Sequence, residues 1–330
     1  MSNTPDTWLD EELAEIKQRL ESTDAGIRRI ALLDLAELDE LETIDWFLSP
    51  LLHDTDADVR AEAARLLAAW ETDAVVHGLC QALIDPSSSV RDHAAQSLTE
   101  YKLASTGLII LPWTQHGDDG VRIAALRALR ELRLPAAFDS ALQNLSHTNP
   151  AVRREAVTVV GWLKNPAALT TLATLATHDV HPDVRRAATG ALGYADDDSV
   201  LPALLAALDD EVWQVREEAA HTLGKLKLKQ AGDALISRLA DPYWQVRIHV
   251  ARSLGKLKTP HATQPLIAAL SHDISNLRKE AALALGEIGD VDAEIALNAA
   301  LSDSDPEVRK AVRIALAQIA SQRLTGATAP

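Results

Sequence analysis

The chain has 330 residues, of which 47% are hydrophobic and 4% aromatic, and its formal net charge at pH 7 is −16. No apolar run approaches the ~18 residues that a membrane-spanning helix needs. The acidic balance also disfavours a general nucleic-acid-binding protein, which needs a basic surface. The single cysteine, Cys80, excludes an internal disulfide and points to a reducing compartment. The N-terminus lacks the features of a signal peptide, so we expect a cytoplasmic protein without contact to a membrane.

The acidity is concentrated in the first third of the chain. Residues 1–100 carry 22 acidic and 7 basic side chains, a net charge of −15, and residues 101–330 carry the remaining −1. We interpret this as a soluble, charged N-terminal end of the fold. The alternative is a docking surface for a basic partner segment, because a surface of one sign steers association.

The first predicted element is an amphipathic helix over residues 6–21. Its apolar residues Leu9, Leu13, Ile16 and Leu20 are spaced by three or four, which is one face of an α-helix. Its other face is acidic, as the outer face of a terminal capping repeat must be polar. A second helix is predicted to start after Asp24.

From there a hydrophobic–arginine pair recurs ten times along the chain. Successive arginines are 31 or 32 residues apart, at Arg28, Arg60, Arg91, Arg122, Arg153, Arg185, Arg216, Arg247, Arg278 and Arg309. A fixed period of this length predicts a solenoid of two-helix repeats, in which each repeat contacts only its neighbours. We therefore predict one solenoid domain over 1–322, with acidic repeats in 1–100 and repeats four to ten in 101–320.

The second helix of each repeat has the pattern Val-Arg-x-x-Ala-x-x-x-Leu-Gly-x-Leu, which residues 210–227 illustrate. Counted from Val215, the positions 0, +4, +8 and +11 are predicted to be buried. The glycine at +9, here Gly224, is predicted to lie near the helix end, where glycine commonly terminates helices. Because the arginine recurs in every repeat, we expect it to bond an acidic residue or carbonyls of an adjacent repeat in a structural ladder.

Two segments depart from the pattern. In residues 101–117 a proline, Pro112, is predicted to kink the first helix of repeat four. A tolerated kink is the simpler interpretation, and a hinge between the two halves of the chain is the alternative. The C-terminal residues 323–330 are predicted to be a disordered tail.

The sequence contains no catalytic or cofactor motif, so we expect a non-enzymatic protein without a cofactor or a metal. No glycine-rich phosphate loop, nucleophile elbow or paired Cys/His spacing is present. His178 and His181 straddle a turn beside two aspartates, which leaves a weak candidate for a metal site. Cys80 is interpreted as a small buried residue.

The pattern D-x-x-V-R-x-x-A-A-x-A-L-G-x-L in a helix pair of about 31 residues resembles the HEAT repeats. It is most similar to the short bacterial kind found in phycobilisome-lyase-like proteins, and it covers residues ~8–320. The resemblance implies an all-α, right-handed α-solenoid of about ten two-helix HEAT repeats, with second helices lining a concave groove. That superfamily includes protein-binding scaffolds, assembly factors and bilin lyase subunits, so the fold does not select a function.

Positions +2, +3, +6 and +10 of the second helices vary between repeats, whereas the buried positions do not. In repeats five to eight these positions, together with position −2, which Trp213 and Trp244 occupy, bring aromatic and basic residues together, the types enriched at interfaces. The alternative is that the tryptophans cover seams between repeats and the lysines are solvated helix ends. The predicted partner-binding residues are Arg154, Trp162, Arg186, Tyr194, Trp213, His221, Lys225, Trp244, His249, Arg252 and Lys256.

The sequence therefore predicts a scaffold, or an assembly or maturation factor, that holds a partner protein or peptide segment in its groove. We expect it to be a monomer. Two alternatives remain open. One is a bilin lyase-like subunit acting on a protein-attached chromophore, and the other is nucleic-acid binding through the local Trp/Lys strip, which the net charge disfavours.

Overall fold

The computed structural model describes residues 7–38 and 43–326, and α-helices and short 3₁₀ turns make up their regular structure. These residues contain no strand, and they contain no helix long and apolar enough to cross a membrane. The predicted all-α class and the two-helix repeat are confirmed. The chain divides into two compact units, the first ending at Leu163 and the second beginning at Lys164. The single domain predicted over 1–322 stays a prediction.

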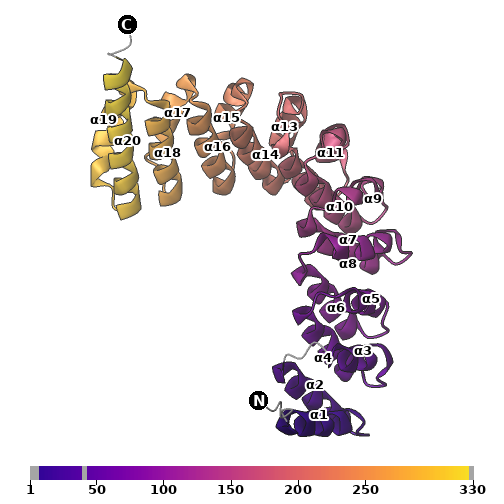
Figure 1. Cartoon of the computed structure of the whole chain (residues 1–330). Coiled ribbons are helices and arrows are strands. Elements are labelled where there is room, and N and C mark those ends of the chain that lie inside the picture. Colours follow the sequence, from indigo (N-terminus) through magenta and orange to yellow (C-terminus); the bar gives the residue numbers. More distant parts are fainter. Residues whose placement is uncertain (1–6, 39–42, 327–330) are drawn as a thin grey trace. The chain divides into compact units, whose positions relative to one another are not determined.

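The first unit contains five helix pairs (Figure 1, indigo to magenta). Its first helices are α1 (Thr7–Leu20), α3 (Ile44–His53), α5 (Asp73–Ala82), α7 (Ala104–Ile110) and α9 (Phe138–Asn144). Its second helices are α2 (Ala25–Leu38), α4 (Ala57–Leu66), α6 (Ser88–Glu100), α8 (Asp119–Leu132) and α10 (Pro150–Leu163).

The second unit contains five further pairs, and its second helices pack side by side in chain order (Figure 1). Its first helices are α11 (Leu169–His178), α13 (Leu201–Leu208), α15 (Gly232–Arg238), α17 (Thr263–Ala269) and α19 (Glu294–Ala299). Its second helices are α12 (Pro182–Ala191), α14 (Trp213–Leu226), α16 (Trp244–Leu257), α18 (Ser275–Ile288) and α20 (Pro306–Gly326).

The predicted buried stripe of the second helices is present. In α14, Val215, Ala219 and Leu223 are all fully buried, as are their counterparts in most other repeats. The position at +11 is less strict, because Leu226 is only half-buried. Ile27, the first copy of the valine position, is 41% exposed. Small residues at +4 let neighbouring second helices approach, which gives the dense packing of a protein interior.

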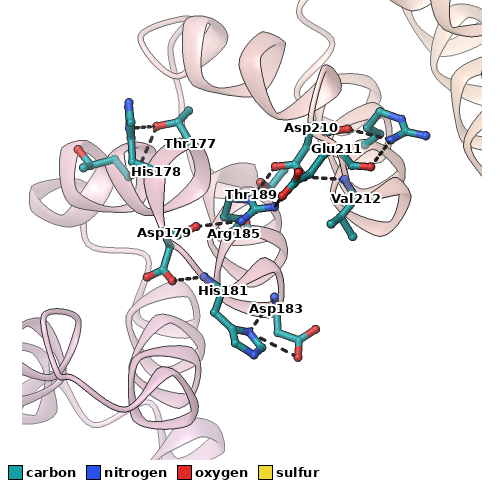
Figure 2. A network of polar contacts seen from close by, with 12 residues as sticks. Thr177, His178, Asp179, His181, Asp183, Arg185, Thr189, Asp210, Glu211 and Val212 are labelled. Atoms are coloured by element: carbon teal, nitrogen blue, oxygen red, sulfur yellow. Dashed lines mark hydrogen bonds and ion pairs between the residues drawn. The ribbon is translucent and has the colours of Figure 1, made fainter.

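The predicted arginine ladder is present as well. In Figure 2, Arg185 donates two hydrogen bonds, of 2.7 and 2.9 Å, to the carboxylate of Asp210 in the next repeat. It also donates one to the backbone oxygen of Asp179, and Asp210 accepts the N–H of Val212 at 2.8 Å. One aspartate thus caps a loop and joins two repeats. The rungs are Arg28–Asp54, Arg60–Asp85, Arg185–Asp210, Arg216–Asp241 and Arg278–Asp303.

Histidine replaces the ladder aspartate at three loops. The Nδ1 atoms of His116, His147 and His272 accept the backbone N–H two residues later at 3.0–3.1 Å, as the aspartate oxygen does elsewhere. None of the three provides a carboxylate for the arginine of the preceding repeat. At the last of them, Arg247 Nη1 lies 2.9 Å from Nε2 of His272. The ladder is therefore interrupted at these joints.

The glycine at +9 lies near the helix end, as predicted, but it does not terminate α14 or α16. Gly224 and Gly255 lie inside α14 and α16, which continue past them. A Cβ at Gly255 would lie 2.8 Å from the Cα of Ala284 in α18, and one at Gly224 would lie 2.9 Å from the Cα of Ser253. Glycine is needed there because neighbouring helix backbones approach closely, not because the helix ends.

The helices end three residues later, in a left-handed residue at +12. Gly289 has φ +79° at this position, whereas Arg133, Lys164, Lys227 and Lys258 have φ between +48° and +56°. A side chain in this conformation costs about 1–2 kcal/mol relative to the right-handed one, and glycine is the residue usually found there. Basic residues therefore occupy a strained position in four repeats.

The structure also bears on the two irregular segments. The first helix of repeat four changes from α7 to a 3₁₀ turn over Leu111–Gln115, which contains Pro112, so the α-helix is interrupted where the kink was predicted. The predicted disordered tail is wrong at its start, because α20 continues through Gly326. The helix α20 packs on α18, and near its C-terminal end Gln322 donates a hydrogen bond of 3.2 Å to the backbone oxygen of Gly286 in α18. Residues 327–330 of that tail lie outside the described residues.

Candidate partner-binding surface

Nine of the eleven predicted partner-binding residues lie in the second unit. They come from α12, α14 and α16 and from the 3₁₀ turn Leu192–Tyr194. Trp213 is the first residue of α14 and Lys225 is the last but one. At a rise of 1.5 Å per residue, the two lie roughly 18 Å apart along the helix. The residues that we predicted as one strip therefore form three separate groups along the second helices.

The first group, which we call the aromatic edge, consists of Trp213, Tyr243 and Trp244 at the N-terminal ends of α14 and α16. The rings of Trp213 and Tyr243 stack with centroids 5.5 Å apart and an interplanar angle of 15°. The Arg216 guanidinium lies 5.8 Å from the centroid of the Tyr243 ring. Tyr243 remains 44% exposed and Trp244 41% exposed. A ladder arginine thus fixes one face of the cluster while the other stays open to solvent.

The second group, the polar midline, consists of Arg186, Glu217, His221, His249, Arg252 and Glu280 at the middle of α12, α14, α16 and α18. Position +6 of one repeat lies beside position +3 of the next. The rings of His221 and His249 accordingly meet edge to face at 5.6 Å. Arg252 makes two hydrogen bonds, of 2.8 and 2.9 Å, to Glu280.

In the polar midline, burial is the main cause of the shifted pKa values of His249 and Glu217. Burial, followed by the charges of Arg252 and His221, lowers the pKa of His249 to about 4, so this imidazole is neutral at neutral pH. Its Nε2 lies 3.2 Å from Glu217, and its buried Nδ1 has no hydrogen-bond partner among the described residues. Burial and the neighbouring Glu218 raise the pKa of Glu217.

Glu280 differs from Glu217 because it has an arginine partner. Burial acts to raise the pKa of Glu280, but the hydrogen bonds and the charge of Arg252, together with those of Lys279, lower it overall. Arg252 is therefore held by its own chain and is not a free cation for a ligand. His249 is likewise turned toward Glu217. Both predicted partner-binding residues primarily join neighbouring repeats.

The third group, the lysine edge, consists of Lys225, Lys227, Lys229, Lys256 and Lys258 at the C-terminal ends of α14 and α16. All five side chains are exposed, and none forms an ion pair within 4 Å with any described residue. Lys227 and Lys258 are two of the strained left-handed residues. Lys225 lies back across Gly193, where an added Cβ would come within 3.0 Å of its Nζ.

The remaining predicted residues have structural partners. The Tyr194 hydroxyl donates to the backbone oxygen of Asn165 at 2.8 Å, and burial raises its pKa to about 12. Arg154 and Trp162 belong to the first unit. Arg154 bonds Glu155 at 2.9 Å, and the guanidinium of Arg133 lies 4.9 Å from the ring centroid of Trp162.

The first unit holds a small pocket between α6 and α8, with a volume of about 230 Å³. Its charged lining residues are Arg91, Asp92, Asp118 and Arg127. Pockets for small organic ligands generally measure 300–1,000 Å³. Because this pocket is smaller, we assign no ligand to it.

The described residues contain no group of three or more His, Cys, Asp or Glu side chains that could hold a metal ion. The two histidines of the weak candidate have separate partners, because His178 bonds Thr177 and His181 lies against Asp183 (Figure 2). Cys80 is a free, buried thiol whose pKa burial raises to about 12, as expected of a small packed residue. It is not an activated nucleophile.

Tyr243, Glu217 and Glu280 belong to these groups but are not among the predicted partner-binding residues. Tyr243 could have been found, because it precedes Trp244 and lies 30 residues after Trp213, close to the 31-residue period. The two glutamates gave no signal, since a glutamate on a helix surface is ordinarily solvated. Their burial depends on the neighbouring helix.

The family profile of HEAT repeats matches residues 13–99, 109–193, 174–244 and 232–317. A comparison with curated proteins found no match. Among solved structures, YibA of E. coli is 19% identical and has a TM-score of 0.62, with 81% of this chain and 99% of that chain covered. An engineered protein is 21% identical, with 94% and 99% covered and a TM-score of 0.51.

Yeast importin-beta (Kap95p) is 13% identical and has a TM-score of 0.67. The match covers 96% of this chain and 51% of that chain, so this chain spans about half the length of that protein. The complex of CpcE and CpcF of phycocyanin lyase from Nostoc sp. PCC7120 is 23% identical, with 64% and 94% covered and a TM-score of 0.45. At such identities the likenesses concern the fold alone, which is one typical of protein-binding scaffolds.

Proposed function

The chain belongs to the HEAT-repeat family, and from that premise we propose that it is a non-enzymatic scaffold that holds a partner protein on the second helices of its second unit. The aromatic edge carries this proposal. Trp213 and Tyr243 form a stacked, pre-ordered pair, and Tyr243 and the adjacent Trp244 are still partly exposed. Tryptophan and tyrosine are the residues most enriched in binding hot spots, and pre-ordering lowers the entropy lost on binding.

Proteins of the same fold support the proposal by their complexes. Kap95p, whose TM-score with this chain is 0.66 in that structure, was solved in complex with Nup1. In such solenoids the repeated helices provide a rigid surface, and side chains that the packing does not require are free to select a partner.

The test is a pull-down from native cell extract with the wild type and a Trp213→Ala/Trp244→Ala variant. Each hot spot is worth 2 kcal/mol or more, so we expect recovery of the partner to fall at least about 30-fold. The matched control is Val291→Ala/Ile295→Ala, which removes exposed apolar side chains near α19 and should leave recovery unchanged. Helicity by circular dichroism verifies that all forms are folded. Equal recovery by both variants, or no partner with the wild type, would contradict the proposal.

A further inference from the structure

The lysine edge is a cationic surface whose positive charges form no ion pairs with the described residues. Five exposed lysines from two successive repeats gather there, and none has an ion-pair partner within 4 Å among the described residues. The arginines of the five aspartate rungs differ, because each of them already has a carboxylate partner in the next repeat. The lysine edge also lies about 18 Å from the aromatic edge along the helix, so it is a separate surface.

Two of these lysines occupy positions at which the backbone favours glycine. Lys227 and Lys258 have φ of 56° and 52°, and the equivalent residue one repeat later is Gly289. A cation at a helix C-terminus is favoured by the helix dipole, but Lys225 and Lys256 already provide one in the last turn of each helix. A side chain that is kept in a strained backbone conformation, at a position where glycine would fit without strain, points to a function.

The ends of the lysine edge are acidic. At the same place in repeat six the chain has Asp196, Asp197 and Asp198, and Gln230 donates to Asp198 at 3.2 Å across the border. On the other side, in repeat nine, the charges of Lys256 and Lys258 act to lower the pKa of Glu287. Asp290 and Asp292 follow it in the chain. The cationic surface is therefore two repeats wide.

The width of the lysine edge indicates which kind of molecule can bind there. A nucleic acid gains affinity from many phosphate contacts along an uninterrupted basic tract, and the flanking aspartates would repel a continuing phosphate backbone. A short protein segment that carries only a few acidic side chains avoids repulsion by the flanking aspartates, because it does not extend beyond the lysines. Neighbouring helices are spaced 8–10 Å apart, which is about the length of three extended residues at 3.3 Å each.

We infer that the lysine edge binds a short, extended acidic segment of a partner protein, with acidic residues three positions apart. One acidic side chain meets Lys225 and Lys227, and the next meets Lys256 and Lys258. Glu287, whose pKa the charges of Lys256 and Lys258 act to lower, lies at the rim of this surface. The inference rests on the proposed scaffold function and specifies the chemistry of the partner.

The test begins with random 12-residue peptides displayed on phage and selected on the full chain. We expect the recovered peptides to be rich in Asp-x-x-Asp and similar acidic pairs at three-residue spacing. The same selection on Lys225→Gln/Lys256→Gln should lose that enrichment, and on Lys102→Gln/Lys310→Gln, which removes two lysines elsewhere, it should keep it. Peptides without acidic excess would overturn the inference. A 12-nucleotide oligo-dT that binds the wild type more tightly than the best peptide would also overturn it.

A second pair of variants separates binding from folding. Lys227→Gly/Lys258→Gly relieves the left-handed strain, so we expect a higher midpoint of thermal unfolding. The same variant should bind the selected peptide roughly three- to tenfold more weakly by fluorescence anisotropy, since it loses two exposed charge contacts. Lys227→Arg/Lys258→Arg should keep wild-type affinity. Unchanged affinity in the glycine variant would contradict the inference.

The outcomes of the two experiments are distinguishable. If the tryptophan variant loses its partner while no acidic peptides are selected, the scaffold function stands and the lysine edge has no such role. If sedimentation velocity shows that the wild type self-associates and the lysine-to-glutamine variant does not, a second copy is the occupant. That result would overturn the inference of a foreign segment.

Discussion

At the scale of single residues, the ladder shows how one side chain fulfils two requirements at once. Arg216 and Asp241 form the most buried rung, with 8% and 0% of their side chains exposed. Asp241 also accepts the N–H of Tyr243, the N-cap residue of α16. Removing one member of a buried, hydrogen-bonded pair typically costs about 3–5 kcal/mol of stability. Because the rung joins two repeats, its loss would destabilise both of them.

His272 is a place where this arrangement is incomplete. A neutral imidazole has one acceptor nitrogen, yet the Ile274 N–H and Arg247 both direct a donor at its ring. We predict that His272→Asp completes the rung and raises the free energy of unfolding by about 1 kcal/mol. Urea denaturation checks this. In an Arg247→Ala background the same replacement should bring no gain, and a gain there would show that the rung is not its source.

His249 makes the free energy of unfolding depend on pH in a range above the one in which carboxylates ordinarily titrate. Its folded-state pKa of about 4 lies below the ordinary value of 6.5, so the unfolded chain takes up a proton first as the pH falls. We predict that wild-type stability decreases between pH 6.5 and about 4, and that His249→Gln lessens this decrease. The control is His261→Gln, at an exposed site. Equal urea midpoints of wild type and His249→Gln at every pH would contradict the prediction.

At the scale of elements, the second helices fit together because glycine and alanine face each other across the seam. A Cβ at Gly255 would approach the Ala284 backbone to 2.8 Å, so α16 and α18 would have to separate. Overpacking of this kind costs typically 1–3 kcal/mol, which exceeds the ~1 kcal/mol that alanine gains over glycine in a helix.

We therefore predict that Gly255→Ala lowers the free energy of unfolding by about 1 kcal/mol, measured by urea denaturation. Gly117→Ala is the matched control, because no atom lies within 4 Å of a Cβ added there. That control should stay within ±0.5 kcal/mol of the wild type. A stabilising effect of Gly255→Ala would show that helix propensity, rather than the close approach, dominates at this seam.

At the scale of the whole molecule, the ladder makes the fold sensitive to acid. At Asp54, Asp85 and Asp241 burial acts to raise the pKa but hydrogen bonds from arginine and backbone outweigh it. At Asp303 the hydrogen bond from Arg278 is the largest effect. In all four the pKa lies below the ordinary aspartate value of 3.8. These carboxylates stabilise the fold above that value, and the contribution is lost as the pH falls through the lowered pKa values.

The free energy of unfolding should accordingly fall steeply below about pH 4, with several repeats losing rungs together. Circular dichroism between pH 7 and pH 2 measures this. His249→Gln, which affects a higher pH window, should leave the transition below pH 4 in place. Full helicity retained at pH 2 would mean that the rungs contribute little to the stability of the repeats.

The sequence alone determined the all-α class, the ten-repeat register, the buried stripe and the arginine ladder. These features follow from spacing within one helix or one period, and a side chain's face on a helix is set by its position in the chain. The predicted kink at Pro112 is of the same kind, because the ring of proline acts on its own helix.

Only the tertiary structure decided which side chains meet across the seams. It showed that Gly224 serves close approach, that Lys227 and Lys258 are left-handed, and that Glu280 is held by Arg252. It also divided one predicted strip into the aromatic edge, the polar midline and the lysine edge. These outcomes depend on the axial offset between neighbouring helices, which packing at the seam fixes and which no spacing within a single helix records.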